Sequence, residues 1–152
     1  MWILIILFKM YIAVILTVIV HESMHYFVAT LIKVRVVNIA FGNSLHLFRI
    51  GKCLISPLIF SGYIEVDQEE LYSKKKVVVI LFYISGIIGN IILTIVAWRL
   101  HNYWGIWLII YNISAIMVNV LPIAENNDVV AMYNYIKIES ESFLYSLNRG
   151  GR

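Results

Sequence analysis

The sequence predicts an all-α membrane protein, with a three-helix transmembrane core and a small β element at the cytoplasmic membrane surface. Of its 152 residues, 61% are hydrophobic and only 14% are charged, and the mean hydropathy is +0.84. Three stretches are apolar over about the 20 residues that a bilayer span needs. A soluble domain of this length could not cover so much apolar surface. We therefore expect one membrane-embedded domain over residues 1–152.

The first predicted span covers residues 1–32. Lys9 is the one charge in the apolar run that precedes the first histidine. The pattern continues beyond the length that a bilayer needs, which predicts a tilted helix. The run has no basic start and no small-residue cleavage pattern after it, so we interpret it as a retained span rather than a signal peptide.

Residues 33–76 form the predicted surface element, which is too polar for a span and too apolar for a free linker. Residues 34–39 and 45–50 are rich in β-branched side chains and partly alternating, and Gly42 and Gly51 each begin a turn signal. We expect a hairpin or a small sheet here, followed by a charged segment that returns the chain to the membrane.

Residues 77–98 and 103–121 form the second and third predicted spans, and neither carries a charge. A short polar connection joins them. The tail at residues 138–152 is polar, and we expect it to fray. The single cysteine, Cys53, excludes an internal disulfide.

Basic residues gather on one side of the predicted membrane. Seven lysines and arginines lie in the first loop and three in the tail, whereas only Arg99 lies at the opposite connection. The positive-inside rule then puts the loop and the tail in the cytoplasm and the N-terminus outside. The net charge of +3 therefore indicates contact with the lipid bilayer and not with nucleic acid.

One motif in the first span has the pattern of a zinc site. Residues 21–25 read His-Glu-Ser-Met-His. The i, i+4 spacing puts His21 and His25 on one helical face, where two imidazoles can bind one Zn²⁺. The Glu22 carboxylate lies where it can take a proton from a water molecule on that zinc. Such a motif can arise by chance, but ionisable groups inside a membrane segment are costly and usually functional.

A catalytic zinc needs a third protein ligand and an open fourth position. Four residues outside the helix are candidates for that ligand: His46, His101, Glu125 and Asp128. His101 belongs to the outer connection and His46 to the surface element. Glu125 and Asp128 follow the inner end of the third span, on the same side of the membrane as the motif.

Asp128 is favoured over Glu125 by the residues around them. Pro122 cannot continue a helix without losing a hydrogen bond, so the third span should end near it. Asn126 and Asn127 then supply a turn that can bring the next side chain back toward the first helix.

Three stretches resemble the site-2 protease family of intramembrane zinc metalloproteases, in its compact bacterial form. Residues 20–29 are similar to the HExxHxxxA helix of that family, and residues 85–90 to the small-residue motif of its second core helix. Residues 119–122 followed by Asp128 resemble its NxxP…DG motif, which implies that Asp128 is the third zinc ligand. The chain has one residue more than usual between the proline and the aspartate, and Val129 in place of the glycine.

Two asparagines are further site candidates. Asn90 follows Gly86 and Gly89, which leave one side of the helix open to a neighbouring backbone. Helix packing alone would explain the glycines equally well. We expect Asn90 and Asn119 to position the substrate or its oxyanion, although Asn90 could instead bond a neighbouring helix.

The resemblance implies one zinc ion, with Glu22 as general base, and hydrolysis of a peptide bond in or near a transmembrane segment of a membrane protein or peptide precursor. It also implies a bacterial cytoplasmic membrane, and the positive-inside rule puts the active site toward the cytoplasm. Residues 56–66 could offer a strand edge to an unwound substrate.

Two alternatives stay open. One is a non-catalytic structural or sensing zinc site, closed by a fourth ligand such as His46 or Glu125. The other is a metal or proton carrier, although such carriers usually have repeats.

Overall fold

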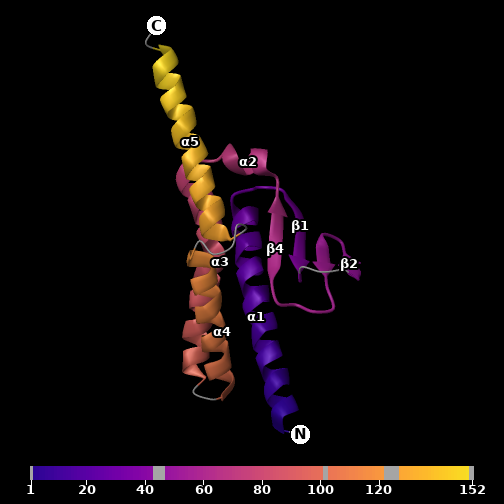
Figure 1. Cartoon of the computed structure of the whole chain (residues 1–152). Coiled ribbons are helices and arrows are strands. Elements are labelled where there is room, and N and C mark those ends of the chain that lie inside the picture. Colours follow the sequence, from indigo (N-terminus) through magenta and orange to yellow (C-terminus); the bar gives the residue numbers. More distant parts are fainter. Residues whose placement is uncertain (1, 43–46, 101–102, 122–126, 151–152) are drawn as a thin grey trace.

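The computed structural model describes residues 2–42, 47–100, 103–121 and 127–150 of the chain (Figure 1). Three helices are long and apolar enough to cross a membrane: α1 (Trp2–Leu31), α3 (Lys76–Arg99) and α4 (Tyr103–Val120). Each begins and ends within one residue of its predicted span. The three-span core expected from the apolar runs is therefore confirmed.

Small residues let the spans approach one another closely. Ala13, Ala97 and Leu108 form a buried cluster that joins all three helices. A Cβ on Gly105 would lie only 2.5 Å from the Ala97 carbonyl oxygen, so α3 and α4 meet backbone to backbone near their connection. Between helices in lipid such close packing replaces the hydrophobic effect as the main source of association.

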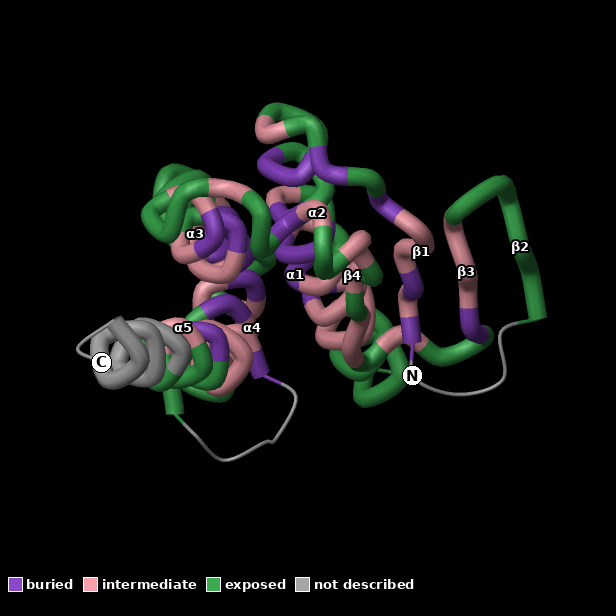
Figure 2. Tube along the Cα trace, turned by 90° about the horizontal axis from the view of Figure 1, so that it is seen from above, coloured by how far each residue is buried: buried purple, intermediate pink, exposed green. Residues whose placement is uncertain are grey.

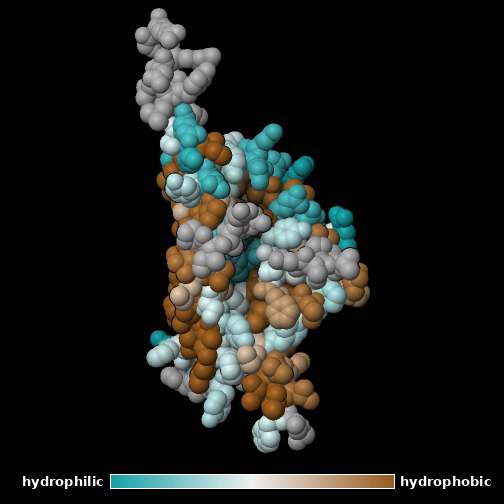
Figure 3. Space-filling view, viewed as in Figure 1, coloured by the Kyte–Doolittle hydropathy of each residue, from teal (hydrophilic) through white to brown (hydrophobic). Residues whose placement is uncertain are grey.

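Most of the apolar surface of the spans faces outward. Only 11% of the most apolar window of α1 is buried inside the protein. Figure 3 shows hydrophobic residues over the lower part of the molecule, where the spans lie, and hydrophilic residues over the part that carries α2 (Gln68–Tyr72). This distribution is that of an integral membrane protein with one end in water.

The surface element is a four-stranded mixed sheet with the order β2-β3-β1-β4. Its strands are β1 (Val36–Phe41), β2 (Phe48–Ile50), β3 (Cys53–Ile55) and β4 (Gly62–Val66). The small sheet is as expected, but the two expected strands, near β1 and β2, do not pair with each other. β2 forms a hairpin with β3 instead, and Gly51 in its turn has φ +60°, a conformation that glycine adopts without strain. β1 pairs with β3 in parallel and with β4 in antiparallel orientation.

The sheet is anchored to the helices by one buried cluster. Val28 and Ala29 of α1, Val36 of β1, Leu71 of α2 and Val79 of α3 all belong to it. Seen from above, α1 lies between the sheet on one side and the other long helices on the other (Figure 2). β4 is the edge strand nearest α1 (Figure 1).

Most of the polar tail belongs to a helix that the sequence analysis did not expect. α5 runs over Asp128–Gly150. Two contacts hold its first half against the rest of the protein: Lys76 Nζ lies 2.8 Å from Glu139 Oε2, and the rings of Tyr72 and Tyr135 stack with centroids 4.9 Å apart. These tertiary contacts stabilise a helix that its polar composition alone does not predict.

Candidate metal centre

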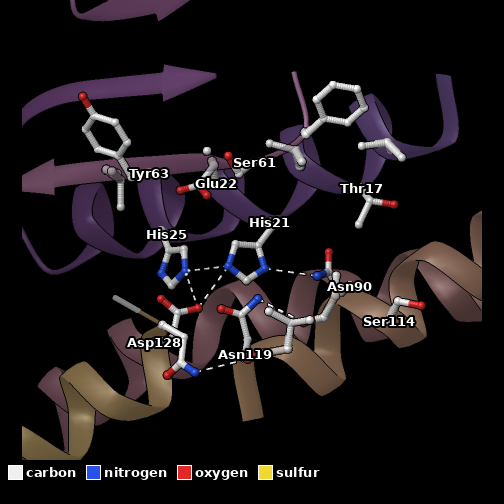
Figure 4. A pocket seen from close by; sticks show the side chains of 18 of the residues that line it. Thr17, His21, Glu22, His25, Ser61, Tyr63, Asn90, Ser114, Asn119 and Asp128 are labelled. Atoms are coloured by element: carbon white, nitrogen blue, oxygen red, sulfur yellow. Dashed lines mark hydrogen bonds and ion pairs between the residues drawn. The ribbon is translucent and has the colours of Figure 1, made fainter. Parts of the chain in front are cut away.

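The side chains of the predicted motif on α1 point in two directions, toward the other helices and toward the sheet. The rings of His21 and His25 point toward α3 and α5, whereas Glu22 lies on the side of β4 (Figure 4). All three side chains are buried. A Cβ on Gly62 of β4 would lie 2.8 Å from Glu22 Cγ, so the sheet edge packs directly over this carboxylate.

Asp128, the first residue of α5, completes a group of three donor atoms. Its Oδ2 lies 3.0 Å from Nε2 of His21 and 3.2 Å from Nε2 of His25, and the two Nε2 atoms are 3.3 Å apart. Zinc bonds of about 2.0–2.1 Å at tetrahedral angles would hold such donors about 3.3–3.4 Å apart. The triangle therefore has nearly the dimensions of three ligands on one zinc ion.

The donor set suits zinc in its chemistry as well as in its size. Two imidazoles and one carboxylate are a common set in catalytic zinc sites, which leave a fourth position open. Burial alone would raise the pKa of the Asp128 carboxyl, but hydrogen bonds and charges from His21 and His25 hold that pKa well below its usual range. Within the described part of the chain, no other three such side chains come together in this way.

α3 supports both histidine rings from behind. Nδ1 of His25 lies 2.9 Å from the Phe82 carbonyl oxygen and 3.0 Å from Ser85 Oγ. Nδ1 of His21 lies 3.1 Å from the side-chain nitrogen of Asn90. Nε2 of each ring is thereby turned toward Asp128.

Gly86 leaves the space in which the two rings meet α3. A Cβ there would lie 2.5 Å from Nε2 of His21 and would also collide with Nε2 of His25. At Gly89 it would instead meet the Met24 side chain, at 2.5 Å from its Cγ. The small-residue motif therefore has two roles. Gly86 makes room for the histidine rings, and Gly89 lets α3 pack closely against α1.

Comparison with known proteins gives a match over the segment that contains the α1 and α3 motifs. Residues 9–105 match the sequence profile described as Peptidase family M50, a match that spans more than half of the chain. The chain belongs to peptidase family M50, the site-2 protease family. No curated protein matches the chain significantly. The M50 match includes the α1 and α3 motifs but ends before Asp128, whose place beside the histidines comes from the fold.

The other predicted site residues of this M50 chain lie in different surroundings. Asn90 is fully buried, and its Oδ1 has no hydrogen-bond partner among the described residues. Asn119 is half-buried, donates to the Ala115 carbonyl oxygen at 3.0 Å and lines the cavity beside the metal site. The competing ligand candidates lie outside the described residues: His46, His101 and Glu125.

Sequence reasoning gave Asn127 only a place in a turn, and missed its hydrogen bonds. Its Oδ1 accepts from the backbone N–H of Val130, which caps the first turn of α5, and its amide donates to carbonyl oxygens at the end of α4. The signal was available, because an asparagine or aspartate just before an apolar-periodic run is a helix N-cap pattern. In this M50 member the cap sets the position of Asp128.

Proposed function

We propose that this protein is a zinc endopeptidase that cleaves a peptide bond in or near a transmembrane segment of a membrane protein or peptide precursor. The observation that carries the proposal is the triangle of donor atoms from His21, His25 and Asp128 beside a buried glutamate. Membership of peptidase family M50 supports it, because that family typically binds zinc.

His21, His25 and Asp128 would hold one zinc ion, which supplies Lewis-acid activation of water and of the peptide carbonyl. Glu22 takes the proton from the attacking water and gives it to the leaving amine. A positioned general base of this kind commonly contributes about 10²–10⁴-fold in rate. Because β4 covers Glu22, that proton transfer takes place away from bulk solvent.

A cavity of about 1070 Å³ provides room for a peptide segment beside these residues. It is lined by α1, α3, α4 and α5 and by residues 60–64 around the start of β4, and it is visible as a hollow between the helices and the sheet (Figure 3). A helical substrate hides its carbonyl groups in internal hydrogen bonds, so it must unwind to be cut. The free edge of β4 could then pair with the unwound backbone.

The site lies toward the end of α1 that carries the basic surface element, which supports a cytoplasmic active site and an external N-terminus. The resemblance to compact bacterial members supports a bacterial cytoplasmic membrane. A structural zinc would be closed by a fourth protein ligand. Among the described residues three donor side chains come together and no fourth joins them.

The test uses the purified full-length chain in detergent or liposomes with a single-span peptide substrate. We expect about one zinc per chain, loss of cleavage on removal of the metal by a chelator, and recovery on adding zinc. Asp128→Ala should lower the zinc content, whereas Glu65→Gln, on the exposed face of β4, should leave it unchanged. Cleavage that persists in the metal-free protein would contradict the proposal.

A further inference from the structure

The hydrogen-bond partner of each histidine decides which ring nitrogen is free for a metal. His25 Nδ1 faces the Phe82 carbonyl oxygen, an atom that can only accept a hydrogen bond. The proton of a neutral His25 therefore lies on Nδ1, and Nε2 presents its lone pair toward His21 and Asp128. The backbone of α3 thus fixes this ring for metal binding.

The Nδ1 atom of His21 faces a side-chain amide instead of a backbone carbonyl. Its Nδ1 lies 3.1 Å from the Asn90 side-chain amide, which can donate or accept according to its orientation. The oxygen and nitrogen of such an amide are assigned from the hydrogen-bond network, since their shapes are nearly identical. If the nitrogen of Asn90 faced the ring, Nδ1 would accept and Nε2 would carry the proton, leaving no lone pair for a metal.

The opposite orientation removes this conflict. With Asn90 Oδ1 toward the ring, Nδ1 donates and Nε2 becomes free for the metal. Metal binding therefore selects the orientation in which Oδ1 accepts from His21.

We propose that Asn90 is a positioning residue, whose Oδ1 fixes the proton of His21 on Nδ1 and so sets the zinc affinity of the site. The proposal rests on the proposed function and replaces the substrate-binding role expected from the sequence. Asn90 is 0% exposed and borders the cavity, and the hydrogen-bond contact that its side-chain nitrogen makes is with the ring of His21. Its action on the metal passes through the histidine ring.

Asn112 on α4 provides a matched control. It is also a 0% exposed asparagine in the same bundle, and its Oδ1 likewise has no partner among the described residues. Its amide donates to the Leu108 carbonyl oxygen at 2.7 Å, within its own helix. Replacing it removes a buried amide without touching either histidine.

The test measures zinc affinity in the full-length protein in detergent, by competition with a chromophoric chelator. Asn90→Leu should weaken zinc binding by about 10–100-fold, the usual effect of losing a partner of a metal-binding histidine. Asn90→Asp should restore it, because a carboxylate accepts the same hydrogen bond. Asn112→Leu should bind zinc as the wild type does. The absorption spectrum of bound Co²⁺ should change in Asn90→Leu alone.

Three results would overturn the proposal: wild-type zinc affinity in Asn90→Leu, equal weakening in Asn90→Leu and Asn112→Leu, or no rescue by Asn90→Asp in a protein that still elutes as a single folded species. Unchanged affinity with reduced cleavage would return Asn90 to a substrate role. The predicted affinity pattern without any cleavage by the wild type would support this inference and reject the proposed peptidase activity. A wild-type chain that binds no zinc would reject both.

Discussion

The side-chain amide of Asn127 donates a 2.6 Å hydrogen bond to the carbonyl oxygen of Leu121. The same side chain accepts from the N–H of Val130 at 2.8 Å, so one residue joins the end of α4 to the first turn of α5. Asp128 is the next residue along the chain. We therefore expect the position of its carboxylate beside the histidines to depend on the hydrogen bonds of Asn127.

Asn127→Ala should weaken zinc binding because it loses both connections, and loss of an N-cap alone typically costs about 1 kcal/mol of stability. Asn127→Asp keeps the cap oxygen but cannot donate to Leu121, so we expect an intermediate affinity. Competition with a chelator measures the zinc affinity of each variant and so gives their order. Ser140→Ala, on the exposed part of α5, is the control. A zinc affinity in Asn127→Ala equal to that of the control would show that Asp128 takes its position without the hydrogen bonds of Asn127.

Gly86→Ala should abolish zinc binding, because the new Cβ would collide with Nε2 of both His21 and His25. Gly89→Ala introduces the same methyl group one turn further along α3, where it meets Met24 instead. We expect Gly89→Ala to reduce thermal stability and to retain zinc. Metal content by elemental analysis distinguishes the two. Full zinc content in Gly86→Ala would mean that the rings bind metal away from α3.

Glu22→Gln should retain zinc and lose cleavage, because the three donor residues remain while the proton acceptor is removed. The expected fall in cleavage rate is about 10²–10⁴-fold. Single-turnover cleavage of a single-span substrate measures it, with zinc content determined on the same sample. Glu65→Gln, a nearby exposed glutamate on β4, should cleave normally. A Glu22→Gln protein with an undiminished rate would remove this residue from the mechanism.

Ile64→Pro should impair cleavage without loss of zinc. Ile39, its partner in β1, donates its N–H to Lys52 on the far side, so the N–H of Ile64 faces the free edge of β4. Proline removes that donor, which an unwound substrate backbone could otherwise use. Ile64→Ala keeps the N–H and serves as the control. Equal turnover in the two variants would leave this strand with only an anchoring role. At Ile59, which also lies within residues 56–66, the N–H already donates to the Tyr11 hydroxyl.

The sequence predicted those features that depend on local pattern. Uninterrupted apolar runs defined all three spans, and the i, i+4 spacing of His21 and His25 required that they share a face. The parallel pairing of β1 with β3 could not be predicted, because the register between distant strands is not encoded in the alternation of either one. α5 was missed because its stability comes from contacts such as Lys76 with Glu139.

The direction of Asn90 was beyond sequence reasoning for a related reason. Its position on α3 relative to Gly86 was known, but the contact of its side chain with His21 depends on how α1 and α3 are rotated against each other. Asp128 approaches both histidines as expected, whereas Glu125 lies outside the described residues, and the role of Asp128 as a ligand stays a prediction.

His21 and Asp128 are 107 positions apart in the chain. A metal ion held by both would cross-link the first membrane span to the last helix and close a loop that contains nearly the whole fold between them. Binding only to the folded chain, it would stabilise the bundle by mass action as well as equip it for chemistry. Zinc supply would then control how long the protein survives in the membrane as much as how fast it works.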